Sequence, residues 1–318
     1  MKLTGLLKSK DEDSQTKEET RDIIAEAGME KSSIIQKIKN APALWTIVIY
    51  VLIAGVFKTF VDKINDMIGI EKPYPYVLFY LAFSFVVLIL FDKYYSVEYK
   101  GNSLSVQRIF KGILFLVPTY FACALMDFII FYQAGGITFD FYEFFAGFRP
   151  GVFEEVLCRG LIIPVLLFGC KKHNIFKAAF ISSALFGSWH IMNFFYGASF
   201  RTTAIQIVYA FGIGMVFAAV YLRTGSLWPS IIVHSLIDCT ANLAEIGIKL
   251  LQAKEAISDA GEQVAETATQ TSGLSLNDCF LFFAFAVTFI SALILLRKSK
   301  HDEIISIWKV RSPKTIYK

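Results

Sequence analysis

The uncharged run TTAIQIVYAFGIGMVFAAVYL at residues 202–222 decides the fold class of this chain. The hydrocarbon core of a membrane is about 30 Å thick, and roughly 20 apolar residues of α-helix are needed to cross it. The run meets that length, is longer than ordinary strands, and does not alternate between apolar and polar residues. It therefore predicts a membrane-spanning helix rather than a strand.

Seven other apolar segments lie on either side of this run. The chain of 318 residues is 55% hydrophobic and only 18% charged, and it contains 31 Phe, a composition that soluble domains do not usually show. The sequence thus predicts an all-α fold, a polytopic bundle of about eight transmembrane helices in a lipid bilayer. The expected helices are Ala43–Val61, Tyr74–Phe91, Ile109–Tyr132, Gly151–Cys170, Asn174–Tyr196, Thr202–Leu222, Pro229–Leu250 and Asp278–Leu296.

The formal net charge of +4 is too small to suggest a nucleic-acid partner, so none is expected. Lys and Arg instead indicate orientation, because loops on the cytoplasmic side of a membrane are rich in them. Basic residues gather before the first helix, in alternate loops and after the last helix, which predicts that both termini are cytoplasmic. They are Lys31, Lys37, Lys39, Lys93, Lys100, Arg108, Lys171, Lys172, Lys177, Arg297, Lys298 and Lys300.

The segment GVFEEVLCRG at residues 151–160 places three charged residues in an otherwise apolar helix. Each charge costs roughly 2.5–3.5 kcal/mol at the centre of a bilayer, so these groups need partners or water. Glu155 and Arg159 are four residues apart and can pair on one helix face, while Glu154 points about 100° away. An alternative is that the two acids lie at the membrane surface, where the start of a helix favours negative charge.

Two later helices also carry polar residues in apolar surroundings. His190 lies in the fifth helix, and His234, Asp238 and Asn242 form a polar stripe along one face of the seventh. Taken singly, His190 is typical of a packing residue, and His234 with Asp238 is typical of a structural hydrogen bond. Because three helices would each bury costly groups used in acid–base and metal chemistry, convergence on one hydrated site explains all of them with a single assumption.

The ordered set of motifs resembles the CAAX protease and bacteriocin-processing family, also called type II CAAX prenyl endopeptidases or lysostaphin resistance protein A-like proteins, and formerly Abi. The motifs are Glu154-Glu155-x-x-x-Arg159, Phe186-x-x-x-His190 and His234-x-x-x-Asp238. The resemblance implies hydrolysis of a peptide bond in a membrane-associated protein or peptide. Eukaryotic relatives act on prenylated proteins, and the inside-positive loops here suit a bacterial cytoplasmic membrane.

The resemblance also implies a role for each motif residue. Glu154 would be the general base that activates a water molecule, and His190 would hold that water and pass its proton to the leaving amine. His234 and Asp238 would stabilise the oxyanion, and Glu155 would pair with Arg159. Two His and a carboxylate also form a familiar zinc set, so Zn²⁺ or another divalent metal held by Glu154, His190 and His234 is an alternative to activation by glutamate alone.

The predicted organisation places the peptidase core between helices without a recognisable motif. The expected segments are a polar cytoplasmic tail at 1–40, accessory transmembrane helices at 41–135, the core at 140–250, a polar loop at 251–277, and the last helix with a basic tail at 278–318. Glu154 and His234 reach the same depth only if the fourth helix begins near Phe141, although Pro150 favours a break there. Pro164 lacks an N–H, so a bend or a hydrated carbonyl at Gly160 is also expected.

Three other functions are compatible with parts of the sequence. A non-catalytic immunity or scaffold protein of the same fold would keep the motifs without cleaving anything. A transporter would use the buried acids as a proton relay, but it would also predict inverted repeats, which the sequence does not show. A serine protease based on Ser199 would leave Glu154 and Glu155 unexplained.

Overall fold

The computed structural model describes part of the chain, and its two units are Met1–Ile49 and Tyr50–Lys318. The described residues are 78–87, 104–168, 174–259 and 276–309, with isolated residues between Val48 and Met67. The predictions for the tail at 1–40, for most of the helix Ala43–Val61, for the loop from residue 260 to 275 and for the end of the chain after residue 309 fall outside them. The description below concerns the second unit.

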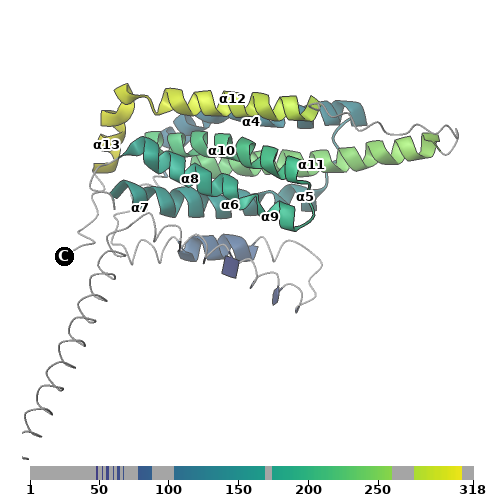
Figure 1. Ribbon diagram of the computed structural model, residues 1–318, viewed down its shortest axis with the longest axis horizontal. Helices are drawn as coiled ribbons and strands as arrows, with labels where there is room; N and C mark the ends of the chain where they lie inside the picture. The colour runs from purple at the N-terminus through teal and green to yellow at the C-terminus, as the bar shows by residue number, and fades with distance from the viewer. Residues whose placement is uncertain are drawn as a thin grey trace, which may run out of the picture. The chain divides into compact units, whose positions relative to one another are not determined.

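Within the described ranges every regular element is helical, which confirms the predicted all-α class (Figure 1). The long helices are α4 (Val106–Ala134), α8 (Ile175–Trp189), α10 (Phe200–Thr224), α11 (Trp228–Asp259) and α12 (Leu276–Leu295). Shorter ones are α5 (Phe141–Ala146), α6 (Phe148–Glu155), the π-helix η2 (Val156–Ile162), α7 (Ile163–Phe168), α9 (Met192–Phe195), the 3₁₀ turn η3 (Lys298–Lys300) and α13 (His301–Lys309).

Five helical segments are long and apolar enough to cross a membrane: Val106–Ala134, Ile175–Phe195, Phe200–Thr224, Trp228–Lys254 and Asp278–Leu295. A shorter apolar helix, Leu78–Val87, lies inside the expected span Tyr74–Phe91. The structure therefore agrees with a helical membrane bundle, while the number of eight spans stays a prediction.

The fourth predicted helix differs most from expectation, because it is assembled from four pieces that begin at Phe141. The Asp140 side chain caps α5 by accepting a hydrogen bond from the Glu143 backbone N–H at 2.9 Å. Pro150 lies in the first turn of α6, where its missing N–H removes no helical hydrogen bond. The helical segment thus continues through Pro150, and the start predicted at Gly151 is wrong. The start at Phe141 is also the one required for Glu154 and His234 to reach the same depth.

The π-helix η2 follows α6 directly and ends just before Pro164. A proline inside a helix removes one backbone hydrogen bond and crowds the preceding turn. Prolines and π-helical turns are both recognised sites at which the regular hydrogen-bond pattern of an α-helix is interrupted. A π-helix that contains Arg159 therefore lies at Gly160, while the expected bend or hydrated carbonyl stays a prediction.

The predicted boundary of the seventh helix is also wrong. We expected a polar loop from residue 251, whereas α11 continues to Asp259. The extension is rich in Leu, Ala, Lys and Glu, which have high helix propensity. Lys249 also pairs with Glu245 at 2.9 Å, and Lys254 donates a hydrogen bond to the Ala134 carbonyl.

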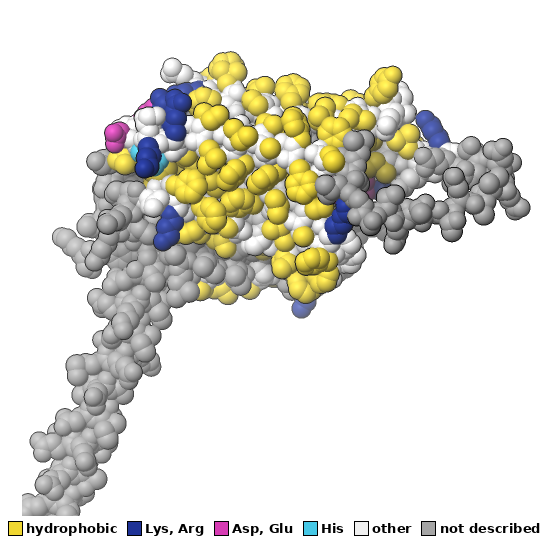
Figure 2. Space-filling model, turned by 45° about the horizontal axis from the view of Figure 1, so that its top comes forward, with side chains coloured by type: hydrophobic (Ala, Val, Ile, Leu, Met, Phe, Trp, Pro, Cys, Tyr) yellow, Lys and Arg dark blue, Asp and Glu magenta, His cyan; other side chains and the backbone are white. Residues whose placement is uncertain are grey.

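Helix α10 forms the centre of the bundle, and every residue from Gly212 to Thr224 is buried. A helix that is apolar on all sides belongs in a core, and α10 indeed packs against α4, α8 and α12. Helix α11 packs beside α4 and crosses α6. The outer faces of α4 and α12 expose large apolar side chains to the membrane region (Figure 2), among them Phe110, Leu114, Phe121, Phe283, Ile290 and Ile294.

The C-terminal helix α13 covers the end of α10. Trp308 donates an indole hydrogen bond to the Leu222 carbonyl at 2.9 Å, and Arg223 pairs with Glu303 at 2.7 Å. The hydrogen bond from Arg223 holds the pKa of Glu303 below its usual value. Helix α13 is therefore fixed to the bundle by both apolar burial and charge.

Because α13 covers the end of α10, the His234 side chain is buried although His234 is close to the start of α11. The turn between α10 and α11 is itself buried, with Thr224, Ser226 and Leu227 at most 2% exposed. Helix α11 consequently begins inside the protein rather than at its surface. Together with the early start at Phe141, this removes the mismatch in depth between Glu154 and His234 that the sequence suggested.

Candidate active site

Glu155 and Arg159 form the ion pair that their spacing predicts. The Arg159 Nη1 atom donates to Glu155 Oε1 at 2.8 Å, and both side chains are completely buried. Breaking a buried pair of this kind by removing one partner costs about 3–5 kcal/mol, because a charge is left without compensation. The pair therefore fixes the junction between α6 and η2.

Arg159 is held from three further directions. Its Nη2 atom donates to the Gly214 carbonyl at 3.1 Å, and its guanidinium lies over the rings of Phe186 at 4.4 Å and Phe217 at 5.6 Å. A Cβ atom on Gly214 would come within 3.2 Å of Nη2 and 3.0 Å of Ser183. The lack of a side chain at Gly214 therefore leaves room for the Arg159 guanidinium.

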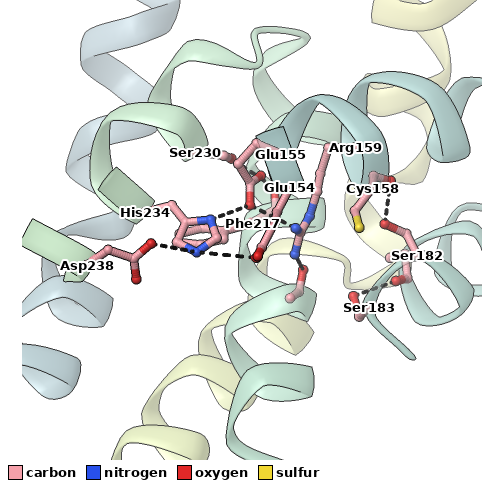
Figure 3. A network of polar contacts seen from close by, with 12 residues as sticks. Glu154, Glu155, Cys158, Arg159, Ser182, Ser183, Phe217, Ser230, His234 and Asp238 are labelled. Carbon is pink, nitrogen blue, oxygen red and sulfur yellow. Dashed lines mark hydrogen bonds and ion pairs between the residues drawn. The ribbon is translucent and has the colours of Figure 1, made fainter. Parts of the chain in front are cut away.

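His234 lies against the same pair (Figure 3). Its Nδ1 atom is 3.0 Å from Glu155 Oε1, so Glu155 accepts hydrogen bonds from both His234 and Arg159. A carboxylate at this distance favours the tautomer with the proton on Nδ1. The Nε2 atom is then directed toward the two other acids.

Those two acids are Asp238 and Glu154. The distance from His234 Nε2 is 3.6 Å to Asp238 Oδ2 and 4.0 Å to Glu154 Oε2. Both are longer than a direct hydrogen bond. Glu154 and Asp238 are also the less buried members of the group, with side chains 17% and 27% exposed. The cluster thus has a rigid part, Arg159–Glu155–His234, and a more open part.

A close contact between α6 and α11 brings these groups together. A Cβ atom on Gly151 would lie 2.6 Å from the Ser235 backbone nitrogen, and one on Gly147 would lie 2.8 Å from the Cys239 Cα atom. The two glycines are four residues apart and line one helix face, as in other close helix contacts in membranes. Sequence analysis did not identify them, although the spacing was the available signal.

His190 is the predicted site residue that the structure leaves apart from this cluster. It follows the last residue of α8, and its ring meets the edge of Phe186 at 5.8 Å between centroids. Phe186 in turn contacts His234 at 5.5 Å. Both imidazoles therefore contact the ring of Phe186, and among the described residues the His190 side chain forms no hydrogen bond or ion pair.

Two other residues considered from the sequence have structural positions. Asn242 donates a hydrogen bond to the Glu143 carbonyl at 2.9 Å, so it fastens α11 to α5 instead of extending the acid cluster. Ser199 caps α10 by accepting a hydrogen bond from the Thr202 backbone N–H at 3.1 Å. The serine-protease alternative therefore has no support from the surroundings of Ser199.

The predicted zinc ligands do not form a metal site as they are placed. In the part of the chain that the structure describes, no three His, Cys, Asp or Glu side chains lie close enough to hold a metal ion. The His190 side chain has no hydrogen bond or ion pair with the acid cluster among the described residues, and His234 Nδ1 is already bonded to Glu155. The hypothesis of bound zinc stays a prediction from the motifs, and no step below depends on it.

About one third of the chain matches a known protein family. Residues 137–240 match the family described as type II CAAX prenyl endopeptidase Rce1-like, which confirms the resemblance inferred from the three motifs. Neither the curated proteins nor the solved structures gave a match. The matching region contains all six predicted site residues, and with the apolar helices it supports an integral membrane protein related to membrane proteases.

Proposed function

We propose that this chain, part of which matches a family of membrane proteases, is an intramembrane endopeptidase that cleaves a membrane-associated protein or peptide. The observation that carries the proposal is the position of Glu154 Oε2 4.0 Å from His234 Nε2, with Asp238 Oδ2 3.6 Å from the same nitrogen. One water molecule can contact both groups across such a separation. A carboxylate and an imidazole sharing a water molecule are what general-base hydrolysis requires.

In this mechanism Glu154 removes a proton from the water as its oxygen attacks the scissile carbonyl carbon. The new C–O bond pushes the carbonyl electrons onto oxygen and forms a tetrahedral oxyanion. Collapse of the oxyanion breaks the C–N bond, and the departing nitrogen takes up a proton. The products are a carboxylic acid and an amine, so one water molecule is consumed in each turnover.

His234 is suited to stabilise the oxyanion as the doubly protonated imidazolium: its Nδ1–H donates to Glu155, which fixes the ring, and its Nε2–H, beside the carboxylates of Glu154 and Asp238, is directed toward the reacting group. Donors that are already oriented before the reaction contribute most to such stabilisation. Asp238 lies beside the same nitrogen and holds the imidazole from the other side. For His190, whose ring contacts Phe186, we propose transfer of the proton from Glu154 to the leaving amine.

We further propose that activity does not depend on a bound metal. Purified protein is then expected to contain well below one zinc ion per chain, and a chelator is expected to leave cleavage unchanged. Metal analysis of the purified protein, with cleavage assays before and after chelation, tests this. About one zinc ion per chain, lost together with activity in His234→Ala, would restore the zinc set.

The orientation predicted from the positive residues completes the proposal: the chain is embedded in a cytoplasmic membrane with both termini inside. A Thr20→Cys variant lacking the native cysteines tests it with a membrane-impermeant thiol reagent. We expect no labelling of intact cells and full labelling after lysis. Labelling of intact cells would place the N-terminus outside.

The proposed function itself is tested by searching for the substrate. Membrane peptides and proteins are compared by proteomics between cells that produce the wild-type chain and cells that produce Glu154→Gln. A species that accumulates uncut only with Glu154→Gln is expected. Equal patterns, together with no cleavage of a farnesylated peptide probe by the purified wild-type protein, would favour the non-catalytic immunity or scaffold alternative.

A further inference from the structure

One large aromatic side chain beside the acid cluster lies outside the three motifs. Phe217 is on α10, its side chain is completely buried, and the mechanism described above does not use it. The centre of its ring lies 5.3 Å from the centre of the His234 ring and 5.6 Å from the guanidinium carbon of Arg159 (Figure 3). Phe217 is therefore in contact with both basic side chains of the rigid part of the site.

The backbone of α10 holds this ring in place between two other helical segments. The Gly214 carbonyl, three residues before Phe217, accepts the hydrogen bond from Arg159 Nη2 at 3.1 Å. The Phe217 carbonyl accepts a hydrogen bond from the Ser230 hydroxyl at 3.3 Å, and Ser230 is four residues before His234 on α11. Residues four apart lie on one face of a helix. The segment from Gly214 to Phe217 thus joins η2, which carries Arg159, to the face of α11 that carries His234.

The hydrogen bond to Glu155 does not by itself fix the plane of the His234 ring. That bond holds one ring atom, Nδ1, and the directions that a carboxylate oxygen accepts are broad. A tilt of the ring about Nδ1 would move Nε2 away from its place beside Glu154 and Asp238. A second contact, on a face of the imidazole, is needed to prevent that tilt.

Phe217 supplies this contact. Phe186 meets the imidazole nearly edge-on, with an interplanar angle of 78°, whereas Phe217 is tilted from it by only 35°. The face of an aromatic ring carries partial negative charge. It attracts a cation within about 6 Å of the ring centre, most strongly where water is excluded. The guanidinium of Arg159 and the imidazolium of His234 both meet these conditions at Phe217.

We infer that Phe217 is a positioning residue: the negative face of its ring holds the His234 imidazolium in the plane that directs Nε2–H toward the developing oxyanion. The inference rests on the proposed function, which gives His234 the role of stabilising that charge. Donors that are oriented before the reaction contribute most to such stabilisation. Phe217 acts through His234 and not on the substrate. The alternative is an ordinary core phenylalanine whose ring only fills space.

A change in the charge distribution of the ring, without loss of the ring, separates these two roles. Pentafluorophenylalanine keeps the aromatic ring but reverses the partial charge on its face, so it still packs but repels a cation. In place of Phe217 it is expected to lower kcat about tenfold with KM unchanged. Phe217→Leu, which has no ring, is expected to lower kcat to a similar extent. A phenylalanine that only fills space would tolerate the fluorinated ring.

Phe211 provides the matched control on the same helix. Its ring contacts the rings of Phe180 at 5.2 Å and Phe289 at 6.0 Å, and among the described residues it lies over no cation. Pentafluorophenylalanine in place of Phe211 is expected to leave kcat at the wild-type value. A thermal unfolding curve for each variant, measured in the same lipid, shows that the protein is folded when kcat is determined.

Magnetic resonance of isotope-labelled histidine follows the His234 ring without any measurement of activity. The chain has only four histidines, and the His234 signal is the one that disappears in His234→Gln. One narrow signal is expected for the full wild-type chain in lipid. A broadened or doubled signal is expected with pentafluorophenylalanine in place of Phe217, because the imidazole then adopts more than one orientation.

Wild-type kcat with pentafluorophenylalanine in place of Phe217 would overturn the inference, and so would an equal loss of kcat from the same change at Phe211. An unchanged, narrow His234 signal in the fluorinated Phe217 variant would overturn it as well. If the wild-type chain cleaves no peptide at all, the proposed function fails, while the His234 signal still decides whether Phe217 holds the ring. The two failures are therefore distinguishable.

Discussion

Replacing Glu154 by glutamine is expected to reduce peptide cleavage by about 10²–10⁴-fold, the contribution of a positioned general base. Glutamine has the same shape as glutamate but cannot take a proton from water. The rigid part of the site does not include Glu154, since Arg159, Glu155 and His234 bond to one another. Membrane insertion and thermal stability should therefore stay close to wild type, and the loss should appear in kcat.

The matched control for this variant is Glu245→Gln. Glu245 is an acid on α11 that is exposed and pairs with Lys249 at the surface. Exposed pairs of this kind contribute about 0–1 kcal/mol, so cleavage should be unaffected. Wild-type kcat in Glu154→Gln, measured on the same peptide, would rule out the mechanism even if the chain proved to be a protease.

Replacing Gly151 by alanine is expected to disable the site without changing any group that takes part in the chemistry. The added Cβ atom would overlap the Ser235 hydroxyl and lie 2.6 Å from its backbone nitrogen and 2.7 Å from its Cα. Helices α6 and α11 must then separate, at a cost of about 1–3 kcal/mol. The 3.0 Å contact between Glu155 and His234 crosses this interface, and a displacement of about 1 Å at a reacting centre can cost 10²-fold in rate.

Two comparisons make this prediction specific. Gly55→Ala is the matched control, because a Cβ atom there meets no atom of the described residues within 4 Å. Ser235→Gly added to Gly151→Ala should not restore activity, since the closest remaining atoms belong to the backbone of α11. Wild-type kcat in Gly151→Ala, with a folded protein, would show that the spacing of these helices does not control the site.

The helical membrane bundle and most of the site could be predicted from the sequence, because both depend on local patterns. Long uncharged segments such as residues 202–222 have one stable arrangement in lipid, a helix whose backbone groups bond internally. The charges of Glu154, Glu155 and Arg159 stand out in such a segment because they are costly there. The spacing of Glu155 and Arg159 also indicated their ion pair, since residues four apart lie on one face of a helix.

Other features depend on where segments distant in the sequence come to lie. The contact of Phe186 with both His190 and His234 joins α8 to α11, and no motif indicates it. The hydrogen bond between His234 and Glu155 joins α11 to α6, and it depends on Gly147 and Gly151, which allow the two helices to approach closely.

The sequence by itself therefore determined that this protein is a helical membrane bundle and which side chains cannot be left in lipid without a partner. Apart from the pair of Glu155 with Arg159, the tertiary structure decided which partner each of these side chains has. The physical reason is one of distance: the cost of a buried charge is a property of the residue and its segment, whereas hydrogen bonds and ion pairs form only within about 3–4 Å. Glu155 and Arg159 come within that range through their spacing along one helical segment, but only the packing of α6 against α11 brings His234 within it of Glu154 and Glu155.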